Sequence, residues 1–270
     1  MTEFTLMVAP NGARRGKGDH LALPLTAEEL AATAKACHQL GAQALHMHVR
    51  DDEGVHSLDA GRYRDAIAAV TECAPAMHIQ ITTESAGLFD VPAQLACLEA
   101  LRPAAASVSV REMARDAALA ARAYAVCAEA GTQVQHILYT PACVAQLQAW
   151  YADGTVPQEM RDVILVLGQY ATGQPAAPAM LPEFLALIAP LALRWSLCAF
   201  GPQEHACLLA AVKAGGQVRI GFENSLGPED GAPWADNAAS VAVFLQQATA
   251  RGHILAPQTD VPGANLREPT

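Results

Sequence analysis

The sequence predicts an α/β fold, a single (β/α)8 barrel of the TIM-barrel class, and three observations favour it. Short apolar runs, partly β-branched, alternate eight times with Ala- and Leu-rich stretches of helical periodicity. Parallel strands need crossover connections, so such a series of units favours a parallel sheet covered by helices. The 270 residues also suit a barrel, which commonly occupies ~250 residues as one domain.

The elements follow in strict alternation along the chain. We expect strands at 4–9, 44–49, 77–83, 106–110, 133–139, 163–167, 193–200 and 218–222. We expect helices at 26–39, 59–73, 90–101, 114–130, 141–152, 181–190, 203–214 and 235–250. Thr26 before Glu28 and Glu29 is typical of a helix start, where a side chain caps free N–H groups and acids suit the dipole. An open doubly wound sheet is the alternative, but no G-x-G-x-x-G follows the first strand.

Domain organisation is expected to be simple, with one barrel domain over residues 1–270. Residues 10–24 form a long loop after the first strand, rich in Gly and basic residues. The tail 251–270 holds three prolines and is expected to pack on the barrel or on a neighbouring subunit.

Composition argues against several classes of partner. The formal net charge is -10, from 27 acidic and 17 basic residues, whereas nucleic-acid binding needs clustered Lys and Arg. Seven scattered cysteines without a C-x-x-C pair indicate thiols in a reducing compartment. The N-terminus does not resemble a signal peptide, and no stretch approaches the ~20 apolar residues that span a bilayer. We therefore expect a cytoplasmic protein that binds neither nucleic acid nor membrane.

Two histidines end the second predicted strand. Side chains alternate along a strand, so His46 and His48 point to the same face, followed by Arg50. Active sites of (β/α)8 barrels lie at the carboxyl ends of the strands, where two such imidazoles can bind one ion. The alternative is a histidine pair used for hydrogen bonding or core filling.

A glutamate ends the eighth predicted strand. By the same alternation Arg219, Gly221 and Glu223 share a face, and strands two and eight flank strand one in a closed barrel. Two His and one Glu leave a metal open to water or substrate, as in catalytic sites. These donors favour zinc, and manganese, cobalt or iron would also accept them. Otherwise Glu223 is a surface loop carboxylate.

Polar side chains also lie on the third and fourth predicted strands. Gln80, Thr82 and Glu84 alternate onto one face, which brings Thr82 and Glu84 to the rim beside the histidine pair. Glu84 could act as a general base or pair with Arg50 or Arg219. Ser107 is a further candidate for polar contacts with a substrate.

Four motifs, in order along nearly the whole chain, resemble the β-keto acid cleavage enzymes, also called 3-keto-5-aminohexanoate cleavage proteins. They are the segments 9–14 (APNGAR), 46–51 (HMHVRD), 56–59 (HSLD) and 221–224 (GFEN). The resemblance implies a zinc-dependent (β/α)8 barrel, commonly a homotetramer, that condenses a β-keto acid with acetyl-CoA to give acetoacetate and a new CoA ester. It implies that His46, His48 and Glu223 bind the metal and that Arg219 engages the reacting centre.

The sequence departs from the family pattern in two places. Asn224 stands where the best-known members have an Asp implicated as a base, and an amide cannot accept a proton as a carboxylate does. Segment 11–14 reads NGAR where they have TGAE, so Arg14 replaces an acid and indicates a dicarboxylate or tricarboxylate-like β-keto acid. Thr82 aligns with a serine of the family and keeps its hydroxyl.

These observations give a scheme in which Arg219 binds the substrate carboxylate, a divalent ion polarises the keto oxygen, and Glu84 replaces the missing base. Asn11, Arg14, Ser107 and Asn224 are the candidate substrate-binding residues. The expected partners are a β-keto acid and an acyl-CoA. Two other functions fit the same residues: a zinc hydrolase of an amide or lactone, and a non-catalytic protein that binds a small acid.

Overall fold

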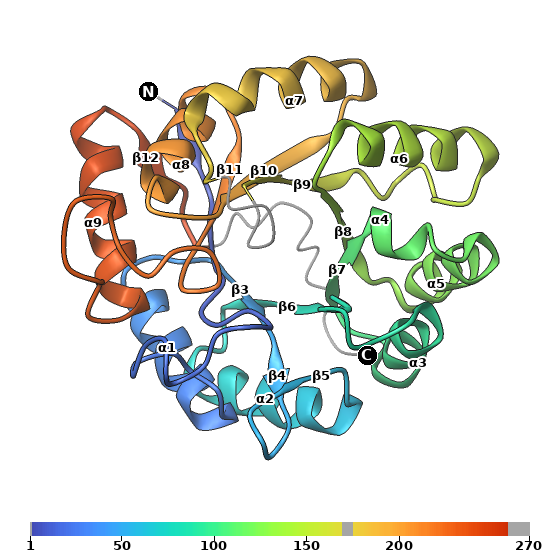
Figure 1. Cartoon of the computed structure of the whole chain (residues 1–270), viewed down its shortest axis with the longest axis horizontal. Helices are drawn as coiled ribbons and strands as arrows, with labels where there is room; N and C mark the ends of the chain where they lie inside the picture. The colour runs from blue at the N-terminus through green and yellow to red at the C-terminus, as the bar shows by residue number, and fades with distance from the viewer. Residues whose placement is uncertain (1, 169–174, 259–270) are drawn as a thin grey trace.

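The computed structural model describes residues 2–168 and 175–258, and its centre is a closed barrel of eight parallel strands (Figure 1). Around the barrel these strands are β2 (Leu6–Val8), β3 (Ala44–Met47), β6 (His78–Thr82), β7 (Ala105–Ser109), β8 (Gln133–Leu138), β9 (Asp162–Leu167), β10 (Arg194–Ala199) and β11 (Gln217–Ile220). Pairing of β11 with β2 closes the ring. The predicted (β/α)8 barrel is therefore confirmed.

Helices form the outer ring of the barrel (Figure 1). They are α1 (Ala27–Gln39), α2 (Ala60–Cys73), α3 (Val91–Leu101), α4 (Val110–Met113), α5 (Ala117–Ala130), α6 (Pro141–Asp153), α7 (Leu181–Ile188), α8 (Glu204–Lys213) and α9 (Asn237–Ala250), with 3-10 turns at Pro178–Met180 and Ala189–Leu191. Thr26 caps α1 in a capping box with Glu29. Among the described residues, no helix combines the length and apolarity needed to cross a membrane.

The strand β3 shows how the barrel positions polar side chains. Leu45 and Met47 are fully buried and belong to the large apolar core, which also contains Leu30 of α1 and Tyr63 of α2. Alternation along the strand turns His46 to the opposite face, into the barrel. Burial of the apolar face against the helices thus fixes which way the histidine points.

The differences from the predicted strands are largest at three segments, 4–9, 44–49 and 218–222. Segment 4–9 divides into β2 and a separate short strand, β1 (Glu3–Phe4), which pairs with β12 (Ile254–Leu255). The strand predicted at 218–222 extends too far, because the observed strand β11 ends at Ile220 and Gly221 has φ 146°. A Cβ at Gly221 would lie 2.3 Å from the Ala9 carbonyl oxygen. Gly221 therefore permits a close backbone approach and does not continue the inward alternation from Arg219.

Two further short strands lie outside the barrel sheet. After β3 the chain forms an antiparallel pair, β4 (Val49–Arg50) and β5 (His56–Ser57). The first part of the tail 251–270 contains β12, which lies against β1. Residues 259–270 of that tail lie outside the described residues, so its packing there stays a prediction.

Candidate active site

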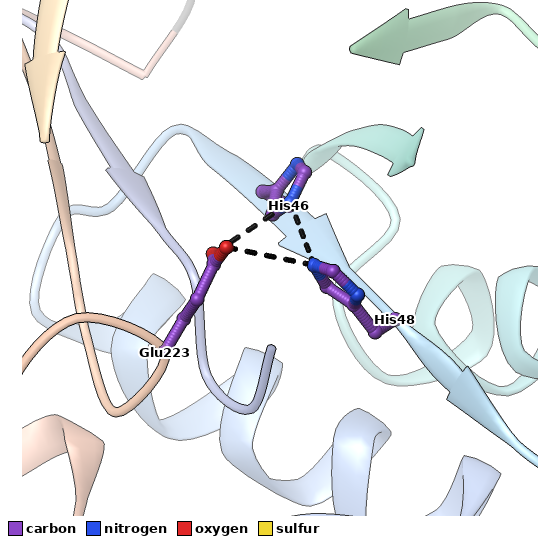
Figure 2. Close-up of side chains that lie close together, drawn as sticks. All are labelled: His46, His48 and Glu223. Carbon is purple, nitrogen blue, oxygen red and sulfur yellow. Dashed lines mark hydrogen bonds and ion pairs between the residues drawn. The ribbon is translucent and has the colours of Figure 1, made fainter. Parts of the chain in front are cut away.

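Three side chains converge at the carboxyl ends of β3 and β11 (Figure 2). His46 Nε2 lies 3.2 Å from His48 Nε2, and the Glu223 oxygens lie 3.7 Å and 3.6 Å from these two nitrogens. Ligand atoms around a tetrahedral ion with bonds of about 2.1 Å are about 3.4 Å apart. The three spacings therefore fit ligands of one metal ion.

The ring of His46 is held from behind by a chain of amides. Its Nδ1 donates to Gln80 Oε1 at 2.7 Å, and Gln80 Nε2 donates to Gln135 Oε1 at 3.2 Å. Gln135 in turn donates to Ser196 Oγ at 3.1 Å. With its proton on Nδ1, the imidazole presents the lone pair of Nε2 toward His48 and Glu223, as a metal ligand requires.

Burial and charge set the protonation of this group. Burial, together with the nearby positive charge of Arg219, lowers the pKa of His46 well below its usual value, so the ring is neutral. Burial alone would raise the pKa of Glu223, but the charge of Arg219, 3.3 Å away, holds that pKa below its usual range. A neutral imidazole beside a carboxylate is the state that binds a divalent cation.

The turn after β11 carries Glu223 to the histidines. The Gly221 N–H donates to Glu204 Oε1 at 3.1 Å, and the next backbone N–H donates to Asn237 Oδ1 at 2.9 Å. The Glu223 N–H donates to the Ala9 carbonyl oxygen at 3.1 Å. Buried side chains of α8 and α9 thus hold a turn at the place where the sequence predicts the end of a strand.

A pocket opens beside the three residues at the same end of the barrel. Six of its lining side chains were singled out in the sequence: Arg14, His46, Thr82, Glu84, Arg219 and Glu223. The remaining walls are Ala13, Arg111, Ile137, Tyr139, Val166 and Phe200. The structure therefore brings Glu84, Arg219 and two of the predicted metal ligands, His46 and Glu223, into one cavity. The third predicted ligand, His48, lies beside it.

The other predicted substrate-binding residues do not line this pocket where the described residues form it. The Asn11 amide donates to the His48 carbonyl oxygen at 2.8 Å and accepts from the His48 N–H at 3.2 Å, so it holds His48 in place. Ser107 donates to Thr82 Oγ1 at 3.2 Å. Asn224 is fully buried, and its amide has no hydrogen-bond partner among the described residues.

Glu84 lies on the His48 side of the pocket. Its carboxylate oxygen is 3.9 Å from His48 Nε2, and burial raises the pKa of the carboxyl above its usual value. Of the two arginines considered as its partners, Arg219 forms its ion pair with Glu223 instead. Glu84 therefore remains available to a bound molecule in the pocket.

Three residues beside the site had no role predicted from the sequence. His56 packs on His48 with ring centroids 5.0 Å apart and bonds the Glu84 carbonyl oxygen at 2.8 Å. Arg111 and Tyr139 line the pocket. Strand alternation could not have found Arg111, because β7 ends at Ser109 and Arg111 lies in α4.

Comparisons with known proteins identify a family for the chain. A family model described as beta-keto acid cleavage enzyme matches residues 4–261. The chain is 26% identical over 235 residues, 84% of each chain, to the 3-keto-5-aminohexanoate cleavage enzyme of Fusobacterium nucleatum. It is 30% identical over 78 residues, 29% of this chain and 28% of the other, to the 3-oxoadipate:acetyl-CoA acetyltransferase of Cupriavidus necator.

Solved structures share the fold. ObcA, in a ternary complex with a C4-CoA adduct and oxalate, is similar with a TM-score of 0.65 at 15% identity, over 88% of this chain and 66% of ObcA. This chain thus spans about two thirds of the length of ObcA. The 3-dehydroquinate dehydratase of Geobacillus kaustophilus has a TM-score of 0.59 at 11% identity, over 92% of both chains.

Proposed function

The chain belongs to the beta-keto acid cleavage enzyme family, and from this membership we propose that it cleaves a β-keto acid with acetyl-CoA, giving acetoacetate and a new CoA ester. The name of the Cupriavidus necator relative, which pairs 3-oxoadipate with acetyl-CoA, supports the choice of co-substrate. The observation that carries the proposal is a buried cationic side chain, Arg219, in the pocket beside the candidate metal ligands.

Arg219 is 3% exposed and carries more donors than the protein uses. One Nη pairs with Glu223 at 3.3 Å and with Cys198 Sγ at 3.3 Å. Its Nε and other Nη are buried without a hydrogen-bond partner among the described residues. Buried charged N–H groups are costly to leave unpaired, and a guanidinium edge matches a carboxylate. We therefore assign the carboxylate of the β-keto acid to Arg219.

We propose Zn²⁺ as the ion held by His46, His48 and Glu223, because two nitrogen ligands and one oxygen leave positions open, as in catalytic zinc sites. When bound, the ion supplies a Lewis acid for a keto oxygen. Manganese, cobalt and iron accept the same donors, so metal analysis of the purified protein decides the identity.

The reaction requires a base. A proton leaves the carbon between the ketone and the carboxylate, that carbon bonds to the acetyl group, and CoA thiolate is released. The thiolate then takes the remaining acyl group as the older C–C bond breaks, and the proton returns to the carbon of acetoacetate. Asn224 cannot accept this proton, whereas Glu84 lines the pocket and its pKa is raised by burial.

Thr82 has a donor to spare for the substrate. Its hydroxyl oxygen accepts from the Glu84 N–H at 3.0 Å and from Ser107 Oγ at 3.2 Å. Since both lone pairs of the oxygen are used, its own hydrogen is left to donate into the pocket that it lines. Ser107 thus acts through Thr82.

We predict that Glu84→Gln lowers kcat by about 100-fold or more while the bound metal is retained, because a positioned base contributes about 10²–10⁴ in rate. Steady-state kinetics on the best β-keto acid, with metal content measured on the same sample, tests this. Near-normal turnover by the variant would remove Glu84 from the base role.

The function itself is tested by incubating the metal-loaded protein with a panel of β-keto acids and acetyl-CoA. Acetoacetate and a new CoA ester should form together, and chelation followed by metal addition should abolish and restore both. Product formation without acetyl-CoA would instead identify a hydrolase, and an inert metal-loaded protein would identify a binding protein.

The homotetramer and the cytoplasmic location are further proposals. The family resemblance supports the first, and the scattered free thiols support the second. Light scattering coupled to gel filtration measures the subunit number.

A further inference from the structure

Arg111 and Tyr139 form one wall of the pocket that the family resemblance does not account for. Arg111 lies in α4, directly after β7, and Tyr139 follows the last residue of β8. Since β7 and β8 are neighbours in the barrel, both side chains reach the same side of the cavity. The Arg111 guanidinium carbon lies 3.5 Å from the centroid of the Tyr139 ring.

The polar atoms of both residues are unused. Neither the guanidinium of Arg111 nor the hydroxyl of Tyr139 makes a hydrogen bond or an ion pair within the part of the chain that the structure describes. Stacking on an aromatic face restricts the plane of a guanidinium but leaves its five N–H donors free at the edge. Burial keeps the Tyr139 pKa well above its usual value, so the phenol remains a donor.

An apolar surface accompanies this pair. Ile137 and Val166 pack together, Tyr139 and Phe200 pack against them, and all four line the pocket. Such a surface suits a short aliphatic chain rather than a polar substituent. The pocket thus offers an anion site at Arg219, beside the candidate metal ligands, and an apolar wall. It also offers unused hydrogen-bond donors for an anion at Arg111 and Tyr139.

We propose that Arg111 and Tyr139 bind a second carboxylate at the far end of the substrate, so that the preferred substrate is a β-keto dicarboxylic acid. This inference rests on the proposed function and specifies its substrate class. Arg14 lines the same pocket from the 10–24 loop and adds positive charge, and among the described residues it is not stacked on an aromatic ring.

Arg111 and Tyr139 could equally bind a phosphate group of CoA, which is an anion like the distal carboxylate of the substrate. Steady-state kinetics distinguish these two ligands. The probes are 3-oxoadipate and 3-oxohexanoate, which have the same chain length and differ in the distal carboxylate. Arg111→Ala should raise KM for 3-oxoadipate by about 10–100-fold, the range for a charged hydrogen-bonded pair. KM for 3-oxohexanoate and for acetyl-CoA should be unchanged.

Two variants accompany this measurement. Tyr139→Phe keeps the ring under Arg111 and loses only the hydroxyl, so KM for 3-oxoadipate should rise by roughly 2–10-fold. Arg122→Ala is the charge-matched control, because Arg122 is exposed on α5 and pairs with Glu99 and Glu129 outside the pocket. A rise in KM for acetyl-CoA, or an equal rise for both keto acids, in Arg111→Ala would overturn the proposal.

A binding measurement separates this inference from the proposed function. By calorimetry, the wild-type protein should bind inert adipate at least 10-fold more tightly than hexanoate, and Arg111→Ala should lose that difference. If no keto acid turns over but this preference is found, the proposed reaction fails and the dicarboxylate site stands. Equal affinities for adipate and hexanoate in the wild-type protein would overturn the site.

Discussion

At the scale of single residues, the candidate metal centre depends on side chains that contact the proposed ligands and are not ligands themselves. Gln80 accepts from His46 Nδ1, and Asn11 brackets the backbone of His48 with two hydrogen bonds. Both amides are buried, so water does not compete for these bonds. Partners of this kind fix the tautomer and direction of a ligand ring before the metal arrives.

We expect Gln80→Leu to weaken metal binding by about 10–100-fold, because the acceptor that holds the His46 proton on Nδ1 is lost. Competition with a chelator of known affinity measures the change. Gln80→Glu retains an acceptor at this place and should bind metal within a few-fold of wild type. Unchanged affinity in Gln80→Leu would mean that the amide has no role in positioning the ligand.

At the scale of elements, the turn that follows β11 is fitted against the loop that follows β2. Gly221 passes against the Ala9 carbonyl, and Gly12 packs against Glu223. A Cβ at Gly12 would lie 2.7 Å from Glu223 Cγ, and Gly12 has φ 68°. Both glycines are needed because two loops from neighbouring strands approach more closely than side chains allow.

Gly12→Ala should therefore displace Glu223 and reduce metal affinity at least 10-fold. Gly54→Ala is the matched control, since Gly54 has φ 79° and open space where the Cβ would lie. Both variants should lose about 1–2 kcal/mol of stability from the left-handed backbone, and only Gly12→Ala should lose metal. Chelator competition and urea unfolding measure the two effects, and equal metal affinity in both variants contradicts the prediction.

At the scale of the whole molecule, a segment near the start of the chain is joined to the segment that follows α9. Gln43 accepts from the Leu6 N–H at 2.8 Å and donates to the Ala256 carbonyl oxygen at 2.7 Å. The Ala256 N–H donates to the Phe4 carbonyl oxygen at 2.8 Å. One buried amide thus connects the first barrel strand, the start of the second and the segment after α9.

For Gln43→Ala we expect a loss of about 2–4 kcal/mol in the free energy of unfolding, because two buried backbone groups lose their partners. Gln148→Ala on the exposed face of α6 is the control and should change stability little. Urea denaturation compares them, and metal affinity should be the same in both. Equal stability of the two variants would show that the Gln43 bonds contribute nothing net.

Much of the fold and part of the site could be predicted from the sequence because the signals are local. Alternating apolar runs identified the strands, and the period of two placed His46 and His48 on one face. The same rule failed at Gly221, where its φ of 146° ends the alternation. Even there the residue type was informative, since glycine adopts such a conformation readily.

What the sequence by itself determined is the barrel, the parity of its strand residues and the kinds of donor at the strand ends. Only the tertiary structure decided that Gln80 supports His46, that Asn11 holds His48, and that Arg111 lies on Tyr139 with its donors unused. The physical reason is that each of these contacts joins residues on different strands or loops. Such pairs meet only when the barrel closes and its strands take their register, which no local pattern encodes.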